Sequence, residues 1–302
     1  MDWEYFFELF LGGLTRGSIY ALIALGYTMV YGIIELINFA HGEIYMIGAF
    51  TALIFANVLS LLGIPQSAIL AASLILAVGY AAAYGFTLEK IAYKPLRNAQ
   101  RLSPLISAIG MSIFLQNYVL LAQTSEFLPF PRMVPSFGFL DPVAHIISSA
   151  EVMILIVTAA AMAALTYLIK FTRIGKAMRA TAQDKQMAML AGVNVNRVIS
   201  ITFVIGSSLA ALAGVMIASH IGMVHFNIGF IAGIKAFTAA VLGGIGSIPG
   251  AVLGAMVLGW TESFATGYVS SDYEDVFAFA LLVLILIFRP EGILGRSTAQ
   301  KV

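Results

Sequence analysis

The stretch SIYALIALGYTMVYGII, residues 18–34, carries no charged side chain and is long enough to cross the apolar core of a bilayer as a helix. The whole chain has this character. Of its 302 residues, 60% are hydrophobic and only 10% are charged, whereas soluble domains carry about 25% charged residues. The sequence therefore predicts an all-α polytopic membrane protein. Further apolar segments of spanning length are expected at about 44–62, 68–88, 103–123, 151–170, 198–219 and 275–289.

Two more apolar segments lie between residues 233 and 266, the first of them short and rich in glycine, and residues 246–250 separate them. They bring the expected number of helices that span the membrane to about nine, in a range of about eight to ten. The run 5–14, which ends at Gly12 and Gly13, is a tenth span, a half-helix or an interfacial turn.

No aqueous segment is long enough to form a soluble domain, so residues 1–302 are expected to form one transmembrane domain with a cytoplasmic segment at about 171–197. Broken or re-entrant helices are expected within it. A weak similarity between residues 26–48 and 243–259, both rich in small residues around a polar break, suggests an inverted repeat of the kind common in transporters.

The charges predict how the chain lies in the membrane. Lys and Arg gather in the loop 89–101, in the stretch 170–197 and in the tail from Arg289 onward, whereas the loops 124–150 and 267–274 are acidic. Because positively charged loops stay on the cytoplasmic side, the three basic segments and the C-terminus are expected there. The side on which the N-terminus lies is left open.

The basic stretch RIGKAMRATAQDKQMAMLAGVNVNRV, residues 173–198, has methionines and alanines at helical spacing beside its charges. We expect two short helices, with Gly192 ending the second and Asn196 a candidate cap for the next span. Apolar faces rich in methionine suit docking into a groove on another protein. The alternative is a loop that only fixes the topology, which would need the charges but not the helical faces.

This stretch resembles the cytoplasmic coupling region of permeases for branched-chain amino acids in the ATP-binding cassette import family. It carries the pattern R-x-G-x-A-x-R-A-x-A-x-D, followed by A-x-x-x-G-V-N. The chain looks most similar to the H-type subunit. It departs from importers at large, since it lacks the Glu-Ala-Ala start and the Leu-Pro end of their docking motif. The other segments that carry the resemblance are GSIYALIALGY at 17–27, INFAHGE at 37–43, GGIGSIPGA at 243–251 and FRPEG at 288–292.

The resemblance implies a permease subunit in the bacterial cytoplasmic (inner) membrane that imports leucine, isoleucine or valine. Its expected partners are a sister permease, two cytoplasmic ATPase subunits of the ATP-binding cassette type, a periplasmic amino-acid-binding protein and the lipid bilayer, but no nucleic acid. Similar permeases carry urea or short amides, so the substrate stays open. The residues expected to couple to the ATPases are Arg173, Gly175, Lys176, Arg179, Asp184, Ala188 and Gly192.

The chain is not expected to be an enzyme by itself. It has no cysteine, no nucleophile elbow and no phosphate-binding loop of the nucleotide-hydrolase type, so ATP hydrolysis is expected on separate chains. No cofactor is expected. No metal site is expected either, because His41 and Glu43 are two positions apart and not the four that place two ligands on one helical face.

The stretch NFAHGE, residues 38–43, indicates a helix break at or within the membrane. Polar groups there are costly and usually pair with one another or line a cavity. They either satisfy an interrupted backbone or belong to the translocation pathway or its gate. The glycine-rich run 243–255 indicates a second break, with tight helix packing as the alternative. The candidates for the pathway or gate are Asn38, His41, Glu43, Asn117, Gly244, Gly246 and Ser247.

A rival hypothesis is a self-contained secondary transporter that couples an ion through intramembrane groups such as Glu35, His41 or Lys235. Lys235 and Glu262 lie on the two arms of the glycine-rich hairpin and are expected to pair. An importer predicts an ATPase partner, whereas the secondary transporter predicts transport by this chain alone.

Overall fold

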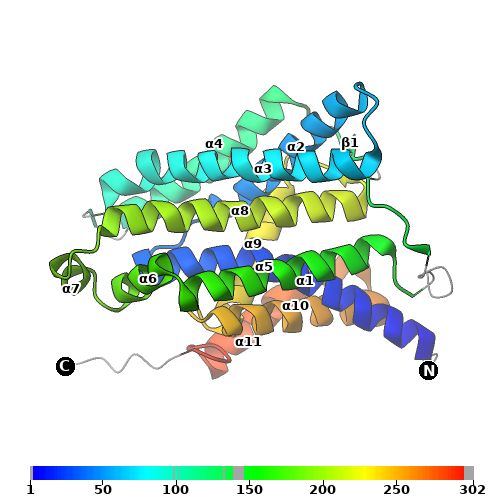
Figure 1. Ribbon diagram of the computed structural model, residues 1–302. Coiled ribbons are helices and arrows are strands. Elements are labelled where there is room, and N and C mark those ends of the chain that lie inside the picture. The colour runs from blue at the N-terminus through cyan, green and yellow to red at the C-terminus, as the bar shows by residue number, and fades with distance from the viewer. Residues whose placement is uncertain (1–2, 98, 101, 132, 139–145, 296–302) are drawn as a thin grey trace.

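The computed structural model describes residues 3–97, 99–100, 102–131, 133–138 and 146–295, so the basic residues Arg101, Arg296 and Lys301 lie outside the described part. The chain folds almost entirely into helices (Figure 1). The helices are α1 (Trp3–Ile34), α2 (His41–Ser60), α3 (Gln66–Leu88), α4 (Leu102–Ala122), α5 (Ser149–Phe171), α6 (Arg173–Gln183), α7 (Lys185–Leu190), α8 (Val195–Ile221), α9 (Ile228–Gly243), α10 (Ile248–Tyr268) and α11 (Glu274–Phe288).

Two short strands accompany the helices. β1 (Leu128–Pro129) pairs antiparallel with β2 (Met223–Val224), which ties the segment after α4 to the end of α8. A π-helical turn, Glu89–Tyr93, and a 3₁₀ turn, Lys94–Leu96, continue α3.

Within the described residues, 7 helices are long and apolar enough to cross a membrane: α1, α2, α3 with its continuation to Leu96, α4, α5, α8 and α10. Two others are shorter, since α9 has 16 residues and α11 has 15. The prediction of an all-α polytopic membrane protein is therefore confirmed. The number of about nine spans stays a prediction, as do the inverted repeat and the single-domain boundaries.

The prediction that residues 5–14 form a separate element is wrong. They are the first part of α1, a continuous helix of 32 residues. Gly13 does not end the helix but lets α10 approach it: a Cβ at Gly13 would lie 2.7 Å from the Trp260 ring and 3.1 Å from the Gly259 carbonyl. A pair of glycines can mark a close helix contact as well as a helix end.

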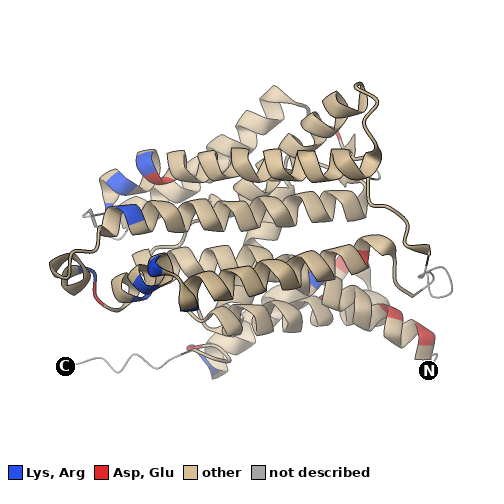
Figure 2. Ribbon diagram, viewed as in Figure 1, with Lys and Arg blue, Asp and Glu red and all other residues tan. Residues whose placement is uncertain are grey.

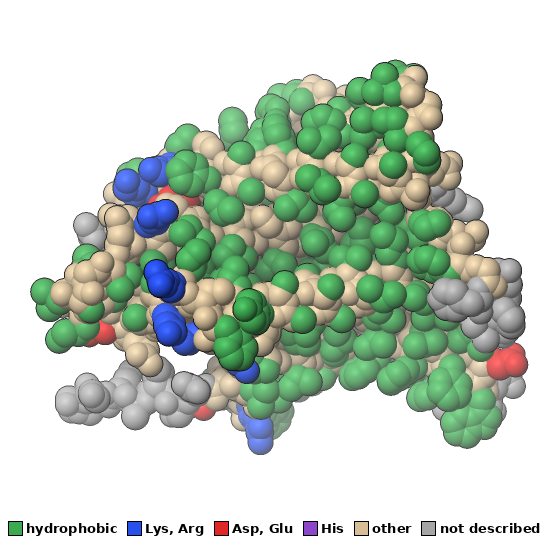
Figure 3. All heavy atoms as spheres, viewed as in Figure 1, with side chains coloured by type: hydrophobic (Ala, Val, Ile, Leu, Met, Phe, Trp, Pro, Cys, Tyr) green, Lys and Arg blue, Asp and Glu red, His purple; other side chains and the backbone are tan. Residues whose placement is uncertain are grey.

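The core lies where α1, α2, α3, α8, α9 and α10 pack together, and α4 and α5 add only a few buried side chains to it, such as Leu115 and Ile154. Figure 1 shows how these helices are arranged. Apolar side chains cover the flanks of the bundle along its length (Figure 3), among them Phe114 on α4, Ile156 on α5 and Ile287 on α11. Such a surface suits hydrocarbon and not water.

The described charges separate along the bundle. Figure 2 shows most Lys and Arg at the end that holds α6 and α7, and Asp and Glu chiefly toward the other end, where α1 begins. The chain after α11 returns to the basic end, because Glu291 and Leu294 line the same cavity as Lys185 of α7. This polarity supports the predicted orientation, and it places the start of α1 on the side opposite to the basic end.

Candidate functional site

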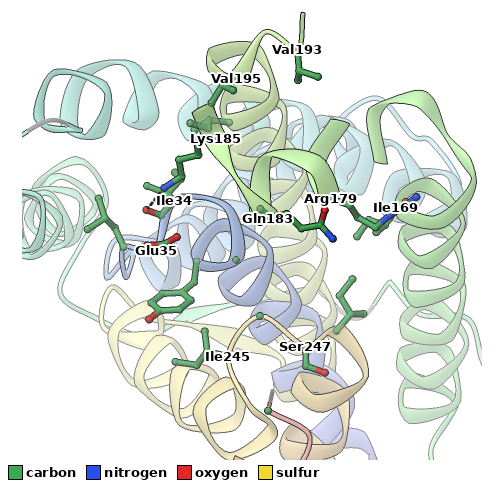
Figure 4. Close-up of a pocket in the computed structure, with 18 of the residues that line it drawn as sticks. Ile34, Glu35, Ile169, Arg179, Gln183, Lys185, Val193, Val195, Ile245 and Ser247 are labelled. Atoms are coloured by element: carbon green, nitrogen blue, oxygen red, sulfur yellow. Dashed lines mark hydrogen bonds between the residues drawn. The ribbon is translucent and has the colours of Figure 1, made fainter. Parts of the chain in front are cut away.

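A cavity of about 2340 Å³ opens at the basic end of the bundle (Figure 4). It brings together three segments that the sequence singled out: Glu35 and Leu36 after α1, Arg179 and Lys185 of the basic stretch, and the glycine-rich residues 245–249. Its basic lining residues are Lys94, Arg97, Lys170, Arg179 and Lys185.

The basic stretch forms two short helices, as predicted, and one residue separates them. The main-chain N–H of Asp184 bonds to the Ala180 carbonyl and ends α6. Its carboxylate then accepts hydrogen bonds from the N–H groups of Gln186 and Met187, at 2.8 and 2.9 Å, and so caps the start of α7. Asp184 therefore fixes the corner between the two helices.

The end of α7 was predicted correctly, but the cap of α8 was not. Gly192 has a φ of +82°, the left-handed conformation expected of a helix-ending glycine. The residue that caps α8 is Asn194, which accepts a hydrogen bond from the Arg197 N–H at 3.1 Å, so the prediction of Asn196 is wrong. Asn196 lies in the first turn of α8 and accepts a hydrogen bond of 2.5 Å from Arg97.

Several of the predicted coupling residues hold the segment against the bundle. Gly175 is buried where α6 meets the Ile169 backbone at the end of α5, a contact that leaves no room for a side chain. Arg179 donates a hydrogen bond to the Ile169 carbonyl, and Ala188 is buried. These residues position α6 and α7 against the bundle.

The remaining predicted coupling residues, Arg173 and Lys176, are exposed. Beside them lies an exposed apolar group that we call the docking surface. Leu190 is 82% exposed and Met187 is 64% exposed, which is unusual for apolar residues on a basic, water-facing segment. The docking surface consists of Ile174, Met187, Met189 and Leu190.

The helix break predicted at NFAHGE is present. α1 ends at Ile34 and α2 begins at His41. Glu35 has a φ of +64°, and it is the one non-glycine residue with positive φ in the described chain. A side chain in that conformation strains the backbone. Glu35 is exposed and lines the cavity, whereas the other two groups of the rival hypothesis, His41 and Lys235, are buried.

The polar residues of this break are buried and tie it to other helices. The Asn38 side-chain oxygen accepts a 2.8 Å hydrogen bond from the Tyr93 hydroxyl. One oxygen of Glu43 accepts a 3.0 Å hydrogen bond from Ser112 of α4. Among the described residues, the second oxygen of Glu43, Nδ2 of Asn38 and Nε2 of His41 have no hydrogen-bond partner. Buried polar atoms without a partner are uncommon in proteins, and three of those in the described chain lie within this one break.

The His41 ring fills a slot between two helices. It packs against the Tyr27 ring with centroids 4.7 Å apart. Gly26 of α1 leaves no room for a side chain beside the ring, and a Cβ at Gly206 of α8 would lie 3.5 Å from it. The place of the His41 ring therefore depends on Gly26, whereas a Cβ at Gly206 would only be in ordinary van der Waals contact with the ring.

The second predicted break, between α9 and α10, is also present. Gly244 and Gly246 have φ values of +99° and +92°. The Ser247 hydroxyl accepts a 3.2 Å hydrogen bond from the Gly250 N–H and caps α10. Gly246 and Ser247 line the cavity, whereas Gly244 packs against the chain that follows α11. The sequence left tight helix packing as the alternative to a break in the run 243–255. Both are present, because Gly254 of α10 also lies against the α9 backbone.

Asn117 lies apart from these residues. It is exposed on α4 and donates a hydrogen bond of 2.8 Å to the Ile113 carbonyl of its own helix. Its neighbour Gln116 bonds to Asn227 at 2.6 Å.

An ion network lies toward the acidic end. The predicted pair is confirmed, since Lys235 lies 3.3 Å from Glu262. Lys235 also lies 2.7 Å from Glu274 and 2.8 Å from Asp275, and Arg16 lies 3.0 Å from Glu274. The sequence places Glu274 at the end of the acidic loop 267–274, and these further contacts with Lys235 and Arg16 were not predicted. These ion pairs join α1, α9, α10 and α11. Within the described residues, no group of side chains able to hold a metal ion occurs.

A bundle of apolar helices, two interrupted helices around a large cavity, and short exposed helices at the basic end define a polytopic membrane permease. The family described as branched-chain amino acid transport system, permease component, matches residues 9–286. The chain belongs to this family.

Relatives agree over nearly the full length. The high-affinity branched-chain amino acid transport system permease protein LivH of Salmonella typhimurium is 51% identical, with 99% of this chain and 98% of the relative covered. BraD of Pseudomonas aeruginosa, described in the same words, is 49% identical with the same coverage. The probable LivH of Methanocaldococcus jannaschii is 26% identical over 94% of this chain and 91% of its own.

Proposed function

We propose that this chain is the H-type permease subunit of an ATP-driven importer of leucine, isoleucine and valine, and that it forms the translocation pathway with a sister permease. The observation that carries the proposal is the identity of about 50% to LivH and BraD over nearly all of each chain. Both proteins are named as high-affinity permeases for branched-chain amino acids, and no described feature of this chain favours urea or short amides.

The proposed partners follow from the surfaces of the chain. Two ATPase subunits of the ATP-binding cassette type dock at the basic end, where the docking surface is exposed and where Arg173 and Lys176 of the same segment are also exposed. ATP hydrolysis belongs to those chains. A periplasmic binding protein delivers the substrate at the opposite end. The membrane is the bacterial inner membrane, with the C-terminus in the cytoplasm.

The proposed mechanism is a population shift between outward-facing and inward-facing states. Closure of the ATPases moves α6 and α7, which border the cavity together with the two helix breaks. The breaks carry the candidate pathway or gate residues Asn38, His41, Glu43, Gly246 and Ser247. ATP shifts the equilibrium only insofar as the ATPases contact the two states differently.

The absence of cysteine allows a direct test. A single cysteine replaces Ala191, which is exposed beside the docking surface, and a matched variant replaces Ser271, which is exposed near the acidic end. After treatment of native membranes with a short bifunctional crosslinker, an ATPase subunit should be captured by A191C and not by S271C. Capture of no ATPase, together with transport of leucine by the purified chain along an ion gradient, would establish the secondary transporter instead.

The substrate specificity of the importer is tested with the complete complex reconstituted in vesicles. Uptake of labelled leucine should require ATP and the binding protein, and excess isoleucine or valine should compete with it. Competition by urea or a short amide, with none by isoleucine, would assign the chain to a different substrate class.

A further inference from the structure

We infer that Lys185 is the positioning residue that transmits movement of the coupling helices to the strained break between α1 and α2. The inference rests on the proposed function, since it needs an ATPase to move α7. It assigns to the Lys185 side chain the transmission of movement from the ATPase subunits to the translocation pathway.

The first observation is the contact itself. Lys185, the first residue of α7, donates a hydrogen bond of 3.3 Å from Nζ to the Ile34 carbonyl, although 151 positions separate the two residues. Ile34 is the last residue of α1, and a carbonyl there has no partner within its own helix. The end of a helix also favours a cation through its dipole. Figure 4 shows the Lys185 side chain reaching from the coupling segment to Ile34, with Glu35 beside it.

The second observation is that Lys185 is firmly joined to the docking surface. Asp184 caps α7 immediately before Lys185, and Met187 follows in the same turn. A displacement of Met187 or Leu190 by a docked partner therefore carries Lys185 with it. Among the described residues, Lys185–Ile34 is the one hydrogen bond that joins α6 or α7 to α1.

The third observation is what lies beyond the contact. The residue after Ile34 is Glu35, with its left-handed backbone, and the buried group of Asn38, His41 and Glu43 follows. Hinges in proteins are a few residues at loops or helix ends that absorb changes of backbone angle, and strained residues cluster at such switch regions. Lys185 therefore acts where α1 can turn relative to α2. By contrast, Arg179 holds α6 to the end of α5 and does not reach this break.

The test uses the complete complex of both permeases, the ATPases and the binding protein in vesicles. Lys185→Met keeps the length of the side chain but removes the donor, and Lys185→Arg keeps a cationic donor. Lys90→Met is the matched control, because Lys90 is also an exposed lysine but lies in the turn after α3, outside α6, α7 and the cavity lining. In K185M the amount of ATPase that copurifies and the rate of ATP hydrolysis should be unchanged. Leucine moved per ATP should fall about tenfold, the effect of losing one hydrogen bond to a charged group. K185R and K90M should stay near the parent value.

A second measurement separates transmission from a merely structural role. A single cysteine at Leu36, which lines the cavity beside Glu35, reports on the break through its rate of reaction with a thiol reagent. Trapping the ATPases with a non-hydrolysable ATP analogue should change that rate in the parent and in K90M but not in K185M.

Three results would overturn the inference. The first is transport per ATP in K185M equal to that of the parent. The second is a nucleotide-dependent change at Leu36→Cys that survives in K185M. The third is loss of ATPase from the K185M complex, which would place Lys185 in docking. Failure of the proposed function looks different, because the parent complex would then contain no ATPase and show no ATP-dependent uptake.

Discussion

The hydroxyl of Tyr93 donates a 2.8 Å hydrogen bond to the side-chain oxygen of Asn38, and both residues are buried. The bond ties the break between α1 and α2 to the π-helical turn that continues α3. The Phe203 ring packs against the Tyr93 ring, with centroids 5.2 Å apart. The ring of Tyr93 therefore contributes to packing independently of the Tyr93 hydroxyl.

Tyr93→Phe removes that bond and keeps the ring. It leaves a buried acceptor on Asn38 unsatisfied, which costs about 1–3 kcal/mol. We expect a lower midpoint of thermal unfolding in detergent, whereas Tyr167→Phe, on an exposed ring of α5, should leave the midpoint unchanged. An equal midpoint for Y93F and the parent would show that the hydrogen bond does not hold the break.

Gly26→Ala places a methyl group against the His41 ring. Overpacking of this kind costs about 1–3 kcal/mol, so we expect weaker thermal stability and reduced leucine uptake by the complete complex. Gly110→Ala is the matched control, because Gly110 also lies within a helix but has open space around it. There the greater helix propensity of alanine should be neutral or stabilising. Normal uptake by G26A would argue against a role for the packing of His41.

Lys235→Met leaves Glu262, which is fully buried, without its cation. Removing one partner of a buried pair costs about 3–5 kcal/mol, so the yield of folded protein should fall sharply. Combining Lys235→Met with Glu262→Gln should restore most of that yield and also leucine uptake. If the double variant folds at parent yield and still fails to transport, Lys235 or Glu262 has a role in transport itself, as the ion-coupled hypothesis requires.

Leu190→Asp introduces a charge at the most exposed apolar residue of the docking surface. If Leu190 is an anchor at the centre of an interface, its loss should cost about 2 kcal/mol of binding, or roughly thirtyfold in affinity. Thermal stability of the isolated permease should not change. Gln186→Asp, exposed in the same helix, controls for the added charge and should still copurify with the ATPase. Equal recovery of ATPase with L190D and Q186D would remove Leu190 from the interface.

The parts of the fold that sequence predicted well are those set by local signals. Apolar length identified the long spans, and the polar residues of NFAHGE identified the first break, because neither depends on a distant contact. Gly192 likewise marks a helix end through its own backbone preference.

The errors arose where a distant contact decides. Asn194 and Asn196 are both good helix caps, and Asn196 is instead held by Arg97, 99 positions away. Gly13 resembles a helix-ending glycine in the sequence, but its role is set by close packing against Trp260 of α10. Glu274 and Asp275 look like a solvated loop, and only the placement of α9 brings Lys235 to them. The sequence signal for the last case was Lys235 itself, because a lone cation in an apolar helix needs a partner.

The unbroken length of α1 has a consequence for the surrounding lipid. A helix of 32 residues is about 48 Å long at 1.5 Å per residue, whereas the hydrocarbon layer is about 30 Å thick. The first turns of α1, which carry Trp3, Tyr5 and Phe6, therefore reach the lipid headgroups, a region in which Trp and Tyr are enriched. The other end of α1 is at Ile34, which contacts Lys185 at the basic end of the bundle. Because α1 is longer than the hydrocarbon layer, one helix has room to carry interfacial aromatic residues at its start and the Lys185 contact at the opposite side of the membrane.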